Sequence, residues 1–219
     1  MSTTGDSRRV ILERIGKATE GGGKDQAEDY AAIQRDYVRA GRMDAKTRLE
    51  LMVERLREYD AEVVETTPEG LVAAIAEQLE ASGRHKFIAP SGLPEEWRSP
   101  GFDWKIDRGL ATAEIEQAEG VVTASFGGIA DSGTIVLHHS ENEGRRVISL
   151  LPDWHLCILR ASQVVETLPE YFARCSRPPE LATYISGPSA TADIEMTRIK
   201  GVHGPRFLHV IVVRDETTT

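Results

Sequence analysis

The stretch AEVVETTPEGLVAAIAEQLEASGRHKFIA, residues 61–89, decides the fold. Its opening residues, 61–65, predict a short strand. Thr67, followed by a proline, is suited to cap a helix that ends at Gly83. Residues 86–89 then predict a second strand. A strand, a helix and a strand in succession are typical of a parallel sheet covered by helices.

Working outward, we expect further strands wherever short apolar runs lie between turn residues. Strands are predicted at 120–125, 128–138, 147–151, 155–159, 183–186 and 207–213, and helices at 44–59 and 169–173. Residues 90–104, rich in Pro, Gly and Trp, are predicted to form an ordered loop. The expected fold is therefore α/β, with one mixed, mainly parallel sheet flanked by helices.

The N-terminal residues, 1–40, are predicted to form a helical arm that precedes a single α/β domain over 41–219. Ser7 is suited to cap a first helix, in which Ile11 and Ile15 lie on one apolar face. This apolar surface is too small to fold alone, so we expect the arm to dock elsewhere, for instance on a partner chain.

Composition narrows the classes of function. The chain has 219 residues and a formal net charge of −9, which disfavours binding to nucleic acid. No apolar run approaches the roughly 20 residues that cross a bilayer, and the N-terminus lacks a secretory signal, so a cytoplasmic location is expected. Cys157 and Cys175 cannot supply the four ligands of an ordinary iron–sulfur or zinc site, and no metal is expected on this chain.

A first polar cluster, Asp131, Ser132, Gly133 and Thr134, lies between apolar stretches. A glycine in such a pattern lets another group approach the main chain. The neighbouring oxygens and N–H groups would then bind a phosphate, a carboxylate or an acyl group. The alternative, which the sequence leaves open, is a strand kink whose side chains bond locally.

A second polar cluster begins directly after a predicted strand, with Ser186 and Gly187, and continues through Ser189, Asp193 and Glu195. Ligands bind open α/β sheets at such turns, outside the carboxyl ends of the strands. The alternative is a helix start, with Thr191 or Ser189 as the cap and the acidic residues favoured by the helix dipole. Because that alternative explains fewer of these residues, a ligand site is favoured.

Proton transfer needs a group that titrates near neutrality, and His203, between two glycines, meets this condition. It is the leading catalytic candidate, with Asp193 and Glu195 beside it. Arg206 is suited to hold a carboxylate or a phosphate with two parallel hydrogen bonds. We expect residues 131–134 and 186–203 to meet at one pocket on the carboxyl side of the sheet, where they would bind a small carboxylate.

No functional role is assigned to the other polar residues. Arg145 and Arg146 are read as a solvated basic pair. His138 and His139 cannot easily share a metal ion, because neighbouring strand residues point to opposite faces. His155 lies in an apolar strand and is read as a core histidine with satisfied hydrogen bonds.

Three segments are long enough to compare with a known family: GVVTASFGGIADSGTIVL (120–137), GRRVISLLPDWHLCIL (144–159) and ISGPSATADIEMTRIKGVHGPRFLHVIVV (185–213). With SGLPEEW (91–97), they resemble the lactate-utilisation protein C family, also called the LUD domain family. The resemblance runs from about Tyr37 to Val213. It implies a fold similar to the group of sugar-phosphate isomerases, coenzyme A transferases and formyltetrahydrofolate cyclo-ligases.

The resemblance also implies two partners, an iron–sulfur protein and a cysteine-rich-domain protein. Together with this chain they would oxidise L-lactate to pyruvate. This chain would be the subunit without a cluster, in keeping with its two cysteines, and the iron–sulfur cluster is expected on a partner. Two alternatives stay open: a free-standing transferase, isomerase or cyclo-ligase acting on a phosphorylated or acyl metabolite, and a regulatory scaffold that assembles through the arm.

Overall fold

The computed structural model describes residues 4–19, 30–175, 177, 179–187 and 204–215. It divides the chain into two units, residues 1–37 and 38–219. The domain boundaries predicted from the sequence, 1–40 and 41–219, stay a prediction.

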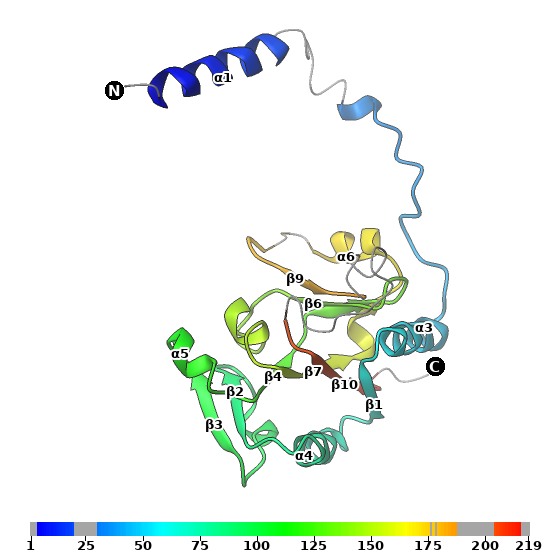
Figure 1. Ribbon diagram of the computed structural model, residues 1–219. Helices are drawn as coiled ribbons and strands as arrows, with labels where there is room; N and C mark the ends of the chain where they lie inside the picture. Colours follow the sequence, from blue (N-terminus) through cyan, green and yellow to red (C-terminus); the bar gives the residue numbers. More distant parts are fainter. Residues whose placement is uncertain (1–3, 20–29, 176, 178, 188–203, 216–219) are drawn as a thin grey trace. The chain divides into compact units, whose positions relative to one another are not determined.

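The first unit contains the helix α1, Thr4–Thr19 (Figure 1). It begins before the predicted cap, so Ser7 lies inside the helix. Ile11, Leu12 and Ile15 each expose more than half of their surface to solvent. The apolar stripe predicted from the spacing is therefore present on a helix that leaves it uncovered within its own unit.

In the second unit, six parallel strands form the main sheet, in the order β1-β10-β7-β4-β2-β3. The strands are β1 (Glu62–Thr66), β2 (Lys86–Pro90), β3 (Asp103–Asp107), β4 (Gly120–Ala124), β7 (Trp154–Arg160) and β10 (Phe207–Val213). Helix α4 (Leu71–Ala81) links β1 to β2, which confirms the unit predicted from residues 61–89. Strand β10 lies between the edge strand β1 and β7 (Figure 1).

Alternate residues of the central strands face opposite sides of the main sheet, and each side has its own core. On one side, α3 (Ala45–Glu58) packs on β7 and β10, and the buried residues there include Met52, Leu56, Leu159 and Val212. On the other side α4 packs on the same strands, and the buried residues include Ile75, Leu79, Ile158 and Ile211. Each such aliphatic side chain contributes about 1.5–3 kcal/mol on burial.

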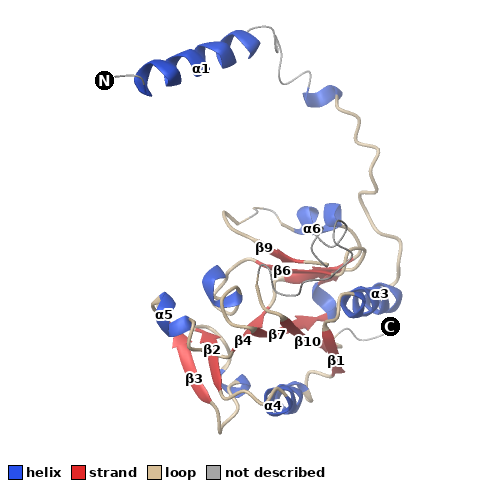
Figure 2. Cartoon of the chain, in the orientation of Figure 1, coloured by secondary structure: helices blue, strands red, loops and turns tan. Residues whose placement is uncertain are grey.

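A second, four-stranded sheet shares the core on the α3 side (Figure 2). Its order is β8-β5-β6-β9, with β5 (Gly127–Ile129), β6 (Thr134–Leu137), β8 (Val164–Val165) and β9 (Thr183–Ile185). Helix α6 (Leu168–Arg174) packs on this sheet through Tyr171 and confirms the helix predicted at 169–173. The mixed α/β class is confirmed, but the antiparallel pairs lie in this separate sheet rather than in the main one.

The single strand predicted at 128–138 is wrong, because the chain reverses at 130–133 and forms the β5–β6 hairpin. The strand predicted at 147–151 is also wrong. These residues form a 3₁₀ turn, η2 (Arg146–Ser149), in which Ile148 is the fully buried residue that anchors the turn. An apolar run is therefore consistent with a buried turn as well as with a strand.

Two predicted boundaries also shift. The loop predicted at 90–104 contains η1 (Glu95–Trp97) and the start of β3, an edge strand that pairs with β2. The helix predicted from Thr67 begins at Leu71, and the Thr67 hydroxyl accepts a hydrogen bond from the Gly70 N–H (3.3 Å). The remaining short helices are α5 (Thr112–Ile115) and η3 (Ala161–Gln163). Within the described residues, no helix has both the length and the apolar character that crossing a membrane requires.

Candidate functional site

Three hydroxyl groups from the two predicted loops lie side by side, and we call Ser132, Thr134 and Ser186 the hydroxyl cluster. The Ser132 and Thr134 hydroxyl oxygens are 2.7 Å apart, and Thr134 donates to the Ser186 hydroxyl oxygen at 3.0 Å. Ser186 in turn donates a long bond, 3.5 Å, to the Ser132 carbonyl. Antiparallel pairing of β6 with β9 brings the loops together, because Ile135 lies opposite Ile185. Ser132 and Ser186 are exposed, while Thr134 is buried.

The turn that carries the cluster requires glycine at position 133. Gly133 has a φ of +63°, and a Cβ atom there would lie 2.5 Å from the Cβ of Arg55 in α3. The Tyr59 hydroxyl donates to the Gly133 carbonyl, and burial raises the pKa of Tyr59, so this hydroxyl keeps its proton at neutral pH. The turn is therefore fixed to the end of α3, and the close approach to the main chain predicted at the glycine occurs in a hairpin turn, against Arg55.

Charge around the turn is mixed. Asp131 is exposed, and its main-chain N–H donates to the Glu166 carbonyl at 3.0 Å. The nearby Arg55 guanidinium is bonded to Glu58, which is the main cause that raises its pKa; attraction to Asp131 adds a smaller part. Arg55 is thus engaged by Glu58, and the Asp131 and Gly133 N–H groups already bond to carbonyls, so an anion at this turn would have to be bound by the hydroxyl groups in place of their bonds to one another.

The structure places these residues differently from the predicted pocket on the carboxyl side of the main sheet. Ser186 follows β9, which belongs to the four-stranded sheet, so the rule for ligands at parallel strand ends does not apply to it. Gly187 follows with a φ of +38°. The remaining predicted site residues, Ser189, Asp193, Glu195 and His203, lie outside the described residues.

Arg206 does not join the hydroxyl cluster. Its guanidinium donates to both carboxylate oxygens of Asp153, at 2.5 and 2.9 Å. Asp153 immediately precedes β7 and Arg206 immediately precedes β10, so the pair lies at the amino ends of these strands. The bidentate geometry expected of Arg206 is present, but its partner is a side chain of the same domain.

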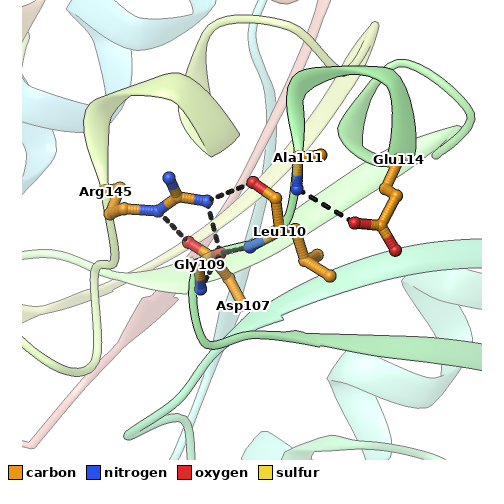
Figure 3. Close-up of polar contacts among 6 residues, drawn as sticks. All are labelled: Asp107, Gly109, Leu110, Ala111, Glu114 and Arg145. Carbon is orange, nitrogen blue, oxygen red and sulfur yellow. Dashed lines mark hydrogen bonds and ion pairs between the residues drawn. The ribbon is translucent and has the colours of Figure 1, made fainter.

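The carboxyl ends of β2 and β4 are covered by residues 138–145, which we call the closing loop. The Gly92 N–H donates to the Glu141 carbonyl at 2.9 Å, and the Ala124 N–H donates to the Asn142 carbonyl at 3.1 Å. The loop ends at Arg145, which donates two hydrogen bonds, 2.8 and 2.6 Å, to Asp107 (Figure 3).

The Asp107 carboxylate is almost completely buried and also accepts bonds from the Gly109 and Leu110 N–H groups, both at 3.1 Å. The hydrogen bonds from Arg145 are the main cause that lowers the pKa of Asp107. Arg145 also donates to the Leu110 carbonyl at 2.9 Å (Figure 3). Arg145, predicted to be solvated, therefore fastens the closing loop to the end of β3.

The two histidines that begin the closing loop have separate partners, although both lie after the end of β6 rather than in a strand. His138 Nε2 lies 2.7 Å from the Tyr171 hydroxyl, and His139 Nε2 lies 2.8 Å from the Thr183 hydroxyl. Burial lowers the pKa of His138. Tyr184 donates to the Tyr171 hydroxyl at 3.2 Å and completes a chain of polar groups that the sequence analysis missed. The local sequence pattern does not indicate this chain of polar groups, because its members become neighbours only when β6 pairs with β9.

His155 is a core histidine, as its apolar strand predicted, but the expectation that both of its nitrogens are hydrogen-bonded is wrong, because its buried Nδ1 has no partner among the described residues. It is fully buried, and its Nε2 lies 2.8 Å from the Thr123 hydroxyl of the neighbouring strand β4. In the described part of the chain, no group of three or more His, Cys, Asp or Glu side chains is arranged to hold a metal ion.

Comparison with known proteins adds an independent observation. A family model described as the LUD domain matches residues 44–213, which is most of the second unit. The chain belongs to the LUD domain family.

Relatives of this LUD domain carry informative names. The chain is 40% identical, over 73% of its length and 76% of the relative's, to a protein named lactate utilization protein C from Deinococcus radiodurans. It is 31% identical to a protein of the same name from Bacillus licheniformis, over 94% of this chain and 93% of the relative. A crystal structure of a DUF162 family protein from Deinococcus radiodurans matches with a TM-score of 0.65 and 34% identity, over 78% of this chain and 99% of that one.

The matched range of the LUD domain contains both strands of the β6–β9 pair and the whole closing loop. It leaves α1 outside. The residues of the hydroxyl cluster therefore lie inside the range that the family model matches.

Proposed function

We propose that this chain is the cluster-free subunit of a three-component system that oxidises L-lactate to pyruvate. The name that the similar proteins share, lactate utilization protein C, is the observation that carries this proposal. The cysteine content supports it, because Cys157 is buried and a cluster needs more cysteines than the two that this chain has. The iron–sulfur cluster would lie on a partner, an iron–sulfur protein, and the third component would be a cysteine-rich-domain protein.

Within that system, the role of this chain would be to bind a small anion through residues 131–134 and the segment 186–203. The contact between Thr134 and Ser186 supports this, because it brings together hydroxyl groups from two loops that are distant in the sequence. Hydroxyl groups and main-chain amides donate hydrogen bonds to a carboxylate or a phosphate without carrying a charge of their own. His203, with Asp193 and Glu195, stays the candidate for proton transfer.

A genetic test addresses the system. Deleting the gene in an organism that lacks a paralogue should abolish growth on L-lactate while growth on pyruvate continues, since pyruvate enters metabolism after the oxidation. Complementation with a tagged copy should restore growth and co-purify the two partners. Normal growth of the deletion strain on L-lactate would exclude an essential role in lactate oxidation.

A biochemical test addresses the site. The double change Ser132→Ala and Ser186→Ala removes the two exposed hydroxyl groups of the cluster, and His203→Ala removes the imidazole. In the assembled complex, the first should raise the KM for L-lactate and the second should lower kcat, with little change in unfolding temperature. Wild-type kinetics in both variants would remove these residues from the site.

A further inference from the structure

Two arginines share one carboxylate at the amino ends of β7 and β10, and we call Arg84, Asp153, Arg206 and Phe207 the arginine cluster. Arg206 makes the bidentate pair with Asp153, and the nearest Arg84 nitrogen lies 3.9 Å from the same carboxylate. Both guanidinium groups also lie over the Phe207 ring, at 5.0 Å for Arg84 and 5.9 Å for Arg206. Arg206 is largely exposed, with 59% of its side-chain surface accessible.

Arg84 is held in place before any ligand arrives. It follows α4 by a short turn in which Gly83 has a φ of +64°, and its guanidinium donates to the Ser82 carbonyl at 3.1 Å. The guanidinium also lies 5.9 Å from the Trp154 ring, a buried core side chain. Only 22% of the Arg84 side chain is exposed. Because folding already orders this long side chain, it loses less conformational entropy when a ligand binds.

The cluster carries a surplus of positive charge. Two guanidinium groups face one carboxylate, whose pKa is lowered by the hydrogen bonds from Arg206, so Asp153 is charged at neutral pH. The neighbouring His209 packs against Trp154 and hydrogen-bonds Gln78 at 3.0 Å. Glu62, which lies beside His209 on β1, offsets part of this charge, but the four residues of the cluster alone carry two positive charges and one negative charge, which favours an anion at this position.

We propose that the arginine cluster is a second anion site, which binds a small oxyanion, a carboxylate or a phosphate, between Arg84 and Arg206. A guanidinium presents parallel N–H donors whose spacing matches the oxygens of either group. Asp153 occupies this position on Arg206 in the free protein and so competes with the ligand. The site is separate from the hydroxyl cluster and does not depend on the function proposed above, because its residues lie just after α4, just before β7 and at the start of β10, whereas the hydroxyl cluster lies at the ends of β6 and β9.

Competition by Asp153 gives the proposal a gain-of-function test. Asp153→Asn removes the opposing charge and frees both guanidinium groups, so binding should tighten roughly three- to tenfold. Arg84→Gln should weaken binding at least about fivefold, which corresponds to the loss of one charge-assisted hydrogen bond. The control is Arg57→Gln, which removes the same charge from an exposed position in α3 and should leave binding unchanged.

The experiment titrates the full-length protein and each variant with L-lactate, pyruvate and inorganic phosphate, by calorimetry at constant ionic strength. The three probes distinguish a carboxylate from a phosphate ligand. The variant with Ser132→Ala and Ser186→Ala should retain this binding, which separates the arginine cluster from the hydroxyl cluster. The proposal is overturned if Asp153→Asn binds none of the probes, or if Arg57→Gln and Arg84→Gln weaken binding equally.

Discussion

The bond between Asp107 and Arg145 offers a quantitative test of how the closing loop is held, through the change Asp107→Asn. The Asp107 side chain is 2% exposed and that of Arg145 is 48% exposed. An amide retains one oxygen for the Gly109 and Leu110 N–H groups but turns an NH₂ donor toward the guanidinium. Loss of a charge-assisted pair that is buried on one side should cost about 3 kcal/mol, less than a fully buried pair because Arg145 regains water.

For a domain of this size, 3 kcal/mol corresponds to a fall in Tm of about 6–12 °C. Urea unfolding followed by circular dichroism at pH 7 would measure the free energy of unfolding directly. The matched control is Glu50→Gln, which breaks the exposed pair between Lys46 and Glu50 (3.8 Å) in α3. That change should cost no more than about 0.5 kcal/mol.

The pH dependence of the stability difference between wild type and Asp107→Asn tests whether the charge of Asp107 causes it. The pKa of Asp107 in the folded protein is lower than the value of 3.8 expected for an unperturbed aspartate. Its charge therefore stabilises the folded state fully above that value, and the contribution is lost as the pH falls through the lower, folded-state pKa. The gap between wild type and Asp107→Asn should be constant from pH 8 to pH 5 and should narrow only below about pH 4. A gap that widens on acidification, or a cost below 0.5 kcal/mol at pH 7, would refute the reasoning.

Three further changes test other parts of the fold. Tyr59→Phe leaves the buried Gly133 carbonyl without its donor, so urea unfolding should show a loss of about 1–3 kcal/mol. Gly120→Ala places a Cβ atom 2.8 Å from the rigid Trp154 ring and should cost a similar amount through overpacking; an unchanged denaturation midpoint would contradict this. His155 has a pKa lowered by burial to about 4, against 6.5 when unperturbed, so unfolding takes up a proton below pH 6.5. The free energy of unfolding of the wild type, relative to that of His155→Gln, should thus fall by about 1.4 kcal/mol per pH unit between pH 6.5 and 4. If the unfolding free energies of the two proteins change with pH in parallel, burial of a neutral His155 is not the cause.

The part of the fold that is local in the sequence could be predicted from the sequence. The β1–α4–β2 unit follows from the apolar spacing and the helix-ending glycine, and the strands at 155–159 and 207–213 follow from runs that are apolar except for one histidine each. The misassigned run 147–151 is just as apolar. In the structure this run is a turn with Ile148 buried, and Arg145, just before it, bonds to Asp107, 38 positions away, a contact that no local pattern reports.

For the candidate site too, the sequence predicted local features but not the contacts between distant residues. The sequence indicated that residues 131–134 carry chemistry-bearing groups and that Gly133 has a conformational role, but not that the turn lies against Tyr59. It placed Arg206 in the same pocket, whereas Asp153 holds that side chain at the amino ends of the strands. Composition and spacing identify polar groups, while strand pairing decides which of them become neighbours.

The position of β10 has a consequence for biosynthesis. Strand β1 has β10 as its neighbour, with Glu62 beside His209, so nearly the whole domain lies between two strands that must pair. A nascent chain on the ribosome therefore leaves one edge of β1 and one edge of β7 without a partner strand until residues 207–213 emerge. Such distant parallel pairing slows folding and leaves strand edges open to aggregation in the meantime. Early termination before β10 would thus leave a chain that chaperones and proteases treat as unfolded.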